Sequence, residues 1–241
     1  MHFNRGMYQP LSITSSANPS RASLDISRLN NAAVLPTTAS SSSFLHGVSR
    51  RLRRERRRRK VGRAYDMALE VAQMIPQGSR VLDIGCGSGY IAHHLSAMRN
   101  AVVTGIDLEP QTEAPIKYRQ YNGLRIPADK ASTDAALLCY VLHHAQDLRT
   151  VLTEVRRVLC NGGVAVVYED IPESAWDRLL CSMHDLKWRK RTGPCTFRAN
   201  AEWRRVFGSY GFEVVNERRL SRWRNLAHPV SRRCYLLKVR S

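Results

Sequence analysis

The sequence has no long apolar run, no paired cysteines and few acidic residues, and each shortage excludes a class of protein. The longest apolar stretches, such as 135–142, are much shorter than the roughly 18 residues that a membrane helix requires. The six cysteines form no C-x-x-C pair and no Cys/His cluster at zinc spacing, which argues against a disulfide framework and a structural metal. We therefore expect no membrane span, no metal, and reduced thiols in a cytoplasmic setting.

The shortage of acids is concentrated near the N-terminus. The chain holds 38 basic and 20 acidic residues, for a net charge of +18. Residues 1–63 carry 13 of the basic residues and only two acids, Asp25 and Glu55. An arginine-rich segment of this kind can bind nucleic acid, although a solvated helix or arm has the same composition. A Ser-rich and Arg-rich leader is also typical of an organellar transit peptide, which would place the protein in an organellar matrix.

Composition divides the chain into three parts. Residues 1–48 are rich in Ser, Asn, Thr and Pro without periodicity, so we expect a disordered tail. Residues 49–64 form the arginine-rich segment. Residues 65–241 are long enough for one α/β domain with a sizeable core. Apolar residues at helical spacing predict a helix over 65–75, ending before Pro76.

From residue 80 onward, short apolar runs alternate with helical stretches, which predicts a parallel sheet covered by helices. The predicted strands are 80–84, 101–106, 116–121, 134–139, 162–168, 212–218 and 232–239. The last two strands follow each other closely and are joined by a loop.

The strongest motif is the segment 81–90, a buried strand that breaks into a glycine-rich turn and opens a helix near Tyr90. Its glycines follow the pattern G-x-G-x-G, whereas a dinucleotide site needs G-x-G-x-x-G, and Tyr90 stands where that third glycine would fall. Asp83 precedes the turn and suits a ligand that carries a cationic ammonium group. Asp107 ends the next strand, where a carboxylate can accept hydrogen bonds from both hydroxyls of a ribose.

With these residues, segment 81–144 resembles the class I S-adenosylmethionine-dependent methyltransferases, particularly the methyltransferase type 11 group that includes ubiquinone and menaquinone biosynthesis enzymes. Residues 124–134 are similar to the family's L-P-F-x-D-x-S-F-D stretch, and 139–144 and 157–163 continue the likeness. The resemblance covers about residues 65–240. It implies a Rossmann-like sheet of about seven strands, mostly parallel with the last antiparallel, and helices on both faces.

The resemblance also implies S-adenosylmethionine as the cofactor. The cofactor-binding residues that it implies are Asp83, Gly85, Cys86, Gly87, Gly89, Asp107, Leu108, Asn122, Gly123 and Cys139. The chain departs from the family between Asp107 and Asn122, where Pro110 and Pro115 predict that the usual helix is abbreviated or missing. Asn122 stands near the family's adenine-binding Asp, and its amide oxygen could accept a hydrogen bond from the adenine amine.

Candidate residues for binding the methyl acceptor follow the fourth and fifth predicted strands. His143 and His144 are candidate catalytic bases. The alternative is that one caps the loop and the other packs locally, since methyl transfer from a sulfonium often needs no strong base. The insertion 173–197 is predicted to form the acceptor side, with Trp176, Met183, His184 and Trp188 as candidate substrate-binding residues. The alternative is that this stripe is core packing. Asn200 is predicted to cap the next helix.

Three functions fit the sequence. The first is methyl transfer to a small-molecule acceptor. The second is RNA methylation assisted by the arginine-rich tail. Residues 139–142 argue against RNA methylation, because they lack the Asn/Asp-Pro-Pro-aromatic motif of many base-amino methyltransferases. The third is a noncatalytic binding module, which would have no need of the glycine turn and Asp107. The sequence carries no signal for an oligomeric state.

Overall fold

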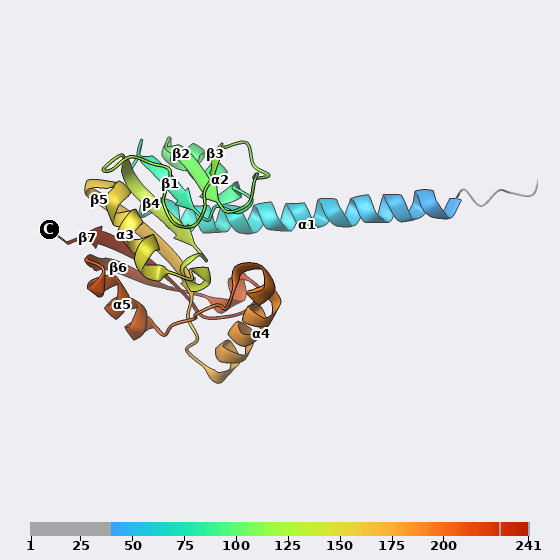
Figure 1. Ribbon diagram of the computed structural model, residues 1–241. Helices are drawn as coiled ribbons and strands as arrows, with labels where there is room; N and C mark the ends of the chain where they lie inside the picture. The colour runs from blue at the N-terminus through green and yellow to red at the C-terminus, as the bar shows by residue number, and fades with distance from the viewer. Residues whose placement is uncertain (1–39, 227, 241) are drawn as a thin grey trace, which may run out of the picture. The chain divides into compact units, whose positions relative to one another are not determined.

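The structure, a computed structural model, describes residues 40–226 and 228–240. Residues 47–241 form one compact unit built around a single seven-stranded sheet of order β3-β2-β1-β4-β5-β7-β6 (Figure 1). The strands are β1 (Arg80–Ile84), β2 (Val102–Asp107), β3 (Lys117–Gln120), β4 (Thr133–Cys139), β5 (Leu159–Asp170), β6 (Phe212–Leu220) and β7 (Arg232–Val239). β1 to β5 pair in parallel, whereas β7 is antiparallel to both β5 and β6.

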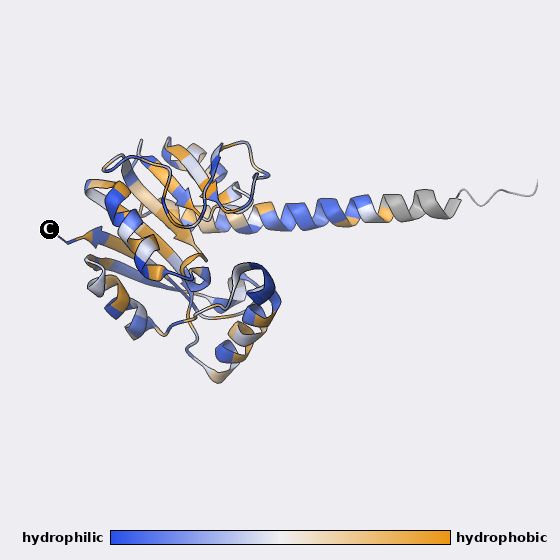
Figure 2. Ribbon diagram, in the orientation of Figure 1, coloured by the Kyte–Doolittle hydropathy of each residue, from blue (hydrophilic) through white to orange (hydrophobic). Residues whose placement is uncertain are grey.

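Helices cover both faces of the sheet because the central strands β1, β4 and β5 are buried on both sides. The helices are α1 (Ser40–Ala72), α2 (Tyr90–Arg99), α3 (Leu148–Val158), α4 (Ala175–Thr192) and α5 (Asn200–Ser209). α1 and α2 pack on one face through residues such as Val71 and Leu95. α3 and α5 pack on the other through residues such as Val155 and Trp203. Figure 2 shows the apolar strands between these helices and the hydrophilic arginine-rich segment of α1.

The predicted fold class is confirmed, and all seven predicted strands are present. The connection 108–116 contains no helix, as the two prolines predict. α1 begins at Ser40, inside the segment that we expected to be a disordered tail, so residues 40–48 are helical and that part of the prediction is wrong. The rest of the predicted tail, residues 1–39, lies outside the described residues.

Asn200 does not cap α5, so this prediction is also wrong. Ala199 occupies the N-cap position and makes no side-chain cap. The Asn200 side chain instead donates to Glu217 at 2.9 Å and accepts from the Tyr235 hydroxyl at 2.8 Å. These partners on β6 and β7 draw the amide away from the helix terminus and attach α5 to the sheet.

α4 follows β5 and has two different faces. Its buried face includes Asp177 and Cys181. Its other face exposes the apolar side chains Trp176, Leu179, Met183 and Leu186, so these residues are not core packing. Within the described part of the chain, no helix combines the length and the apolar character needed to cross a bilayer.

Candidate active site

The glycine turn after β1 lies at the carboxyl edge of the sheet, where ligands bind in open parallel α/β folds. Gly85 and Gly87 have φ angles of 68° and 52°, in the left-handed region that disfavours a side chain. A Cβ atom on Gly85 would lie 2.5 Å from Val141, whereas one on Gly87 would meet no atom within 4 Å. Gly85 is therefore required by packing, while Gly87 borders open space at the tip of the turn.

Asp83 lies at the bottom of this turn and is 1% exposed. Its Oδ2 atom is buried without a hydrogen-bond partner in the described structure. Burial, reinforced by the nearby Asp107 carboxylate, raises the pKa of Asp83 to about 8. A buried carboxylate without a counter-charge is costly, and a cationic group placed beside it would remove that cost.

Asp107 ends β2 and faces the glycine turn. Its Oδ2 atom accepts a 2.7 Å hydrogen bond from the Gly87 amide, and its Oδ1 atom accepts one of 3.2 Å from the Glu109 amide. The structure therefore brings Asp83, the glycine turn and Asp107 together, as the sequence predicts. Cys86 lies in the same turn, where burial raises the pKa of its thiol.

The residues predicted to border the adenine lie just after β2 and β3. Leu108 and Asn122 line one hollow together with Gln120, Tyr121, Arg125 and Pro127. Gly123 packs beside Leu108, with 3.3 Å between its ideal Cβ position and the leucine Cδ2 atom. The Asn122 oxygen accepts hydrogen bonds from the Leu124 and Arg125 amides at 3.0 and 3.2 Å. Both of its lone pairs are thus used locally, so its amide nitrogen is the group left for a ligand.

Cys139 ends β4 beside the same edge, and Tyr140 follows it. Burial raises the pKa of the Cys139 thiol well above its ordinary value, which keeps this side chain uncharged. Tyr140 has a φ angle of 59°, a costly conformation for a large residue and one that clusters at functional sites. It lines a hollow with Arg63, Asp66, Met67, Glu70, Tyr168, Asn225 and Arg232. Sequence reasoning missed Tyr140, although its place directly after the fourth strand is a usable signal.

His143 and His144 follow in a short 3-10 turn, η1 (Leu142–His144). His143 is 1% exposed, and its Nδ1 atom lies 2.5 Å from the Glu169 carboxylate on β5. Burial opposes the charged form of His143, but the Glu169 carboxylate outweighs this effect and raises its pKa. The Leu142 amide donates a 2.7 Å hydrogen bond to Glu169 and fixes the carboxylate in place.

α4 brings two of the four predicted substrate residues to these histidines. His184 Nε2 lies 3.4 Å from His144 Nε2, and the Trp188 ring stacks on His184. Burial and the neighbouring histidines lower the pKa of His144 to about 3 and that of His184 to about 4. Trp176 and Met183 lie instead on the exposed face of α4.

Comparison with known proteins agrees with this geometry. Residues 82–167 match the family model described as "Methyltransferase domain". An uncharacterised methyltransferase of Mycobacterium tuberculosis is 34% identical over 113 residues, 43% of this chain and 56% of that protein. A sterol 24-C-methyltransferase of Gibberella zeae is 30% identical over 43% of this chain and 30% of its own length. A tRNA (carboxymethyluridine(34)-5-O)-methyltransferase of Macaca fascicularis is 31% identical over 42% of this chain and 16% of its own length.

Solved structures extend the likeness in fold. A SAM-dependent methyltransferase of Methanosarcina mazei has a TM-score of 0.56 at 20% identity, over 71% of this chain and 97% of that one. The cyclase SpnF has a TM-score of 0.59 at 16% identity, over 73% of this chain and 81% of that one. The chain thus has the Rossmann-like methyltransferase fold and spans about half or less of the curated relatives named here. None of these names refers to ubiquinone or menaquinone, so that part of the resemblance stays a prediction.

Proposed function

We propose that this chain is an S-adenosylmethionine-dependent methyltransferase that acts on a small-molecule acceptor. The observation that carries the proposal is the buried Asp83 carboxylate, whose Oδ2 atom has no partner among residues 40–226 and 228–240, beside an open glycine turn. A ligand with an ammonium group and a ribose matches Asp83 and Asp107, and a dinucleotide does not match the glycine spacing.

In this proposal the residues at and around the glycine turn bind different parts of the cofactor. Asp83 pairs with the ammonium group of the cofactor, and the open space beside Gly87 admits its methionine portion. Asp107 receives the ribose hydroxyls, and Leu108 with Asn122 borders the adenine. When bound, S-adenosylmethionine supplies a methyl group on a sulfonium, which is reactive enough that positioning and exclusion of water carry much of the catalysis.

The acceptor enters at the end of β4 in this proposal. Tyr140 and its hollow lie on one side of that strand end, and His143 and His144 follow it. The Glu169 contact orients His143 in one tautomer, as a positioned histidine requires. His144 and Trp188 border the acceptor from the α4 side.

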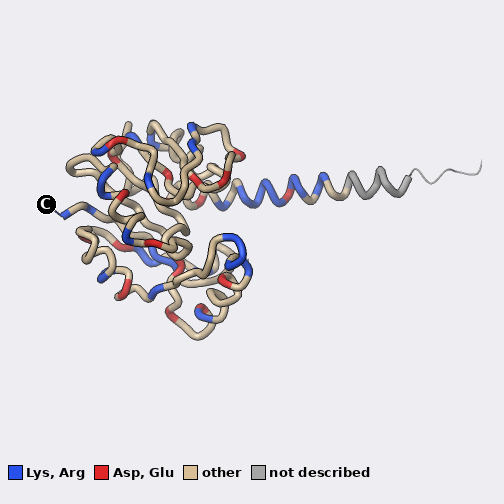
Figure 3. The backbone as a smooth tube through the Cα atoms, viewed as in Figure 1, with Lys and Arg blue, Asp and Glu red and all other residues tan. Residues whose placement is uncertain are grey.

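RNA is the second candidate acceptor, because arginines line an exposed part of α1. Arg54, Arg57 and Arg58 are exposed and border a hollow that also contains Tyr65, Tyr90, His93 and His94. Basic side chains that alternate with aromatic rings suit a single-stranded nucleic acid. Figure 3 shows how densely basic residues follow one another along α1.

The two acceptors are separated by incubating the protein with methyl-labelled S-adenosylmethionine, once with total cell RNA and once with a small-metabolite extract. The proposal predicts label in an extractable metabolite, lost in His144→Ala or Trp188→Ala and kept when Arg56 to Arg59 are replaced by Ser. Label in RNA that disappears in the arginine variant would establish the second candidate. Cofactor binding without transfer into either extract would favour a noncatalytic module.

A further inference from the structure

Three imidazoles from two distant segments meet where α4 crosses the turn after β4. One nitrogen each from His143, His144 and His184 lies within 4.8 Å of the other two. His184 is 40 residues from His144 along the chain, so no sequence spacing could indicate the group. The centroid of the His143 ring lies 4.2 Å from that of His144 and 5.4 Å from that of His184.

The distance between His144 Nε2 and His184 Nε2 is 3.4 Å. This exceeds the range of 2.7–3.2 Å for ordinary N–H hydrogen bonds. Two nitrogens bound to one tetrahedral zinc ion, each about 2.0–2.1 Å from the metal, lie about 3.3–3.4 Å apart. The observed separation therefore fits two ligands of one metal ion better than a hydrogen bond.

His143 has the second-sphere contact that metal-binding histidines usually have. Its Nδ1 atom lies 2.5 Å from Glu169, so in the neutral ring, the form that binds a metal, Nδ1 carries the proton and Nε2 presents its lone pair. His143 Nε2 is buried and has no hydrogen-bond partner among the described residues. A metal ion beside His144 and His184 would supply that missing partner.

His144 shows a similar division between its two nitrogens. Its Nδ1 atom lies 3.0 Å from the Thr192 hydroxyl and 3.2 Å from Cys195 Sγ, while Nε2 faces His184. Cys195 is thus on the opposite edge of the ring and does not belong to the ligand group.

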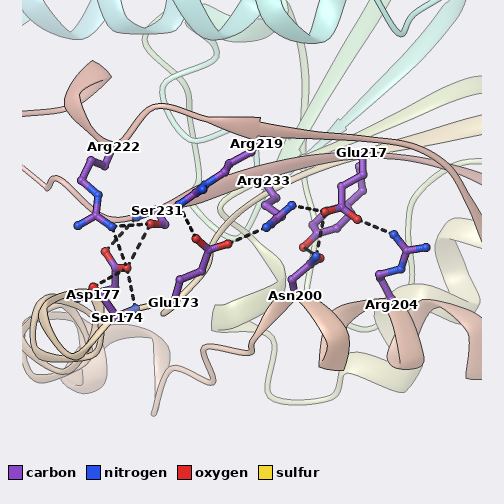
Figure 4. A network of polar contacts seen from close by, with 11 residues as sticks. Glu173, Ser174, Asp177, Asn200, Arg204, Glu217, Arg219, Arg222, Ser231 and Arg233 are labelled. Carbon is purple, nitrogen blue, oxygen red and sulfur yellow. Dashed lines mark hydrogen bonds and ion pairs between the residues drawn. The ribbon is translucent and has the colours of Figure 1, made fainter.

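The start of α4, the helix that carries His184, is anchored by side-chain contacts. Ser174 and Asp177 form a capping box at its N-terminus. Asp177 also accepts hydrogen bonds from the Ser231 amide at 3.1 Å and from Arg222 at 3.3 Å. Figure 4 shows this network, which ties the start of α4 to the residue that precedes β7.

We infer that His143, His144 and His184 bind a divalent transition-metal ion, Zn²⁺ by ligand type and geometry. Imidazole suits zinc and its neighbours, whereas magnesium and calcium prefer oxygen ligands. No fourth side chain joins the group within the described residues. Three protein ligands with an open fourth position are the arrangement of zinc sites that bind water or a substrate atom. The inference does not depend on the proposed methyl transfer.

The test is a titration of the chelator-treated full chain with Co²⁺, followed by visible absorption and by metal analysis after desalting. We expect one tetrahedral Co²⁺ per chain that Zn²⁺ displaces, and loss of the spectrum in His144→Gln and in His184→Gln. Glu169→Gln should keep the site and weaken it about 10- to 100-fold.

Two matched variants serve as controls. His93→Gln, on an exposed position of α2, and Cys195→Ser should both bind Co²⁺ as the wild type does. Circular dichroism and thermal unfolding report whether each variant is folded. A wild type that binds no Co²⁺ or Zn²⁺ would overturn the inference. So would binding that persists in the folded His144→Gln/His184→Gln double variant, or that disappears in Cys195→Ser.

Discussion

Asp83 differs from Asp107 in lacking a partner for one oxygen in the described structure, and its raised pKa has a consequence for stability. The folded chain keeps the Asp83 proton up to about pH 8, whereas the unfolded chain releases it near its ordinary pKa of 3.8. Between these values the folded state binds more protons, so the free energy of unfolding falls as pH rises.

Asp83→Asn removes this penalty. In the absence of ligand, the variant should gain stability over the wild type as pH rises from 4 to 8, reaching roughly 1–3 kcal/mol at pH 8. Denaturant titrations at pH 5 and pH 8 measure the difference. An equal difference at both pH values would show that Asp83 is charged in the folded protein throughout.

Asp107 is the second residue with a direct test. Asp107→Ala should weaken binding of S-adenosylmethionine by roughly 1–3 kcal/mol, because charge-assisted hydrogen bonds are lost. Asp107→Asn is the control, since its amide oxygen can still accept from Gly87 and should keep part of the affinity. Calorimetry that finds the wild-type affinity in Asp107→Ala would assign Asp107 to the support of the turn alone.

Among single residues, the sequence predicts best where the proposed cofactor residues lie. Asp83 and Asp107 were predictable because each is fixed by a strand end, and parallel strands meet at one edge. The hydrogen bonds that the Asn122 oxygen accepts from its own turn were not predictable, because they depend on the backbone path of 122–125. His184 was predicted as a substrate residue, but its contact with His144 depends on where α4 packs.

α4 places His184 and Trp188 beside His144. Asp177→Ala removes the capping box and the contacts to Ser231 and Arg222, and we expect a loss of about 1–3 kcal/mol in the free energy of unfolding. Affinity for S-adenosylmethionine should be unchanged, because the glycine turn lies on other elements. Exposed Asp147 caps α3 through Thr150, so Asp147→Ala is a matched control with a smaller loss. Equal losses in the two variants would contradict the anchoring role.

Strands were more predictable than helix limits. β1 and β4 are apolar runs that end at turn residues, so their predicted limits agree with the structure to within one residue. β5 begins at Leu159 and ends at Asp170, so it is longer at both ends than the predicted strand 162–168. The start of α1 at Ser40 could not be predicted, because the serine-rich composition around it is typical of disorder. The exposure of Trp176 and Met183 was hidden as well, because an apolar stripe has the same sequence pattern whether it is covered or open.

We expect the unit from residue 47 onward to bind the cofactor without the residues that precede it. A chain beginning at Ser49 should fold and bind S-adenosylmethionine with the affinity of the full chain, since every proposed cofactor residue lies beyond residue 80. Thermal unfolding with and without the ligand compares the two chains. A large loss of affinity in the shorter chain would assign the N-terminal residues to the site.

Calorimetry at pH 7 measures directly whether the glycine turn and Asp83 bind S-adenosylmethionine. The account predicts an affinity of micromolar order. Heats measured in two buffers of different ionisation enthalpy should also reveal proton release on binding, because the ammonium group lowers the raised pKa of Asp83. Asp83→Asn should lose both the affinity and the proton release. No heat at millimolar S-adenosylmethionine, or binding of NAD in its place, would contradict the account.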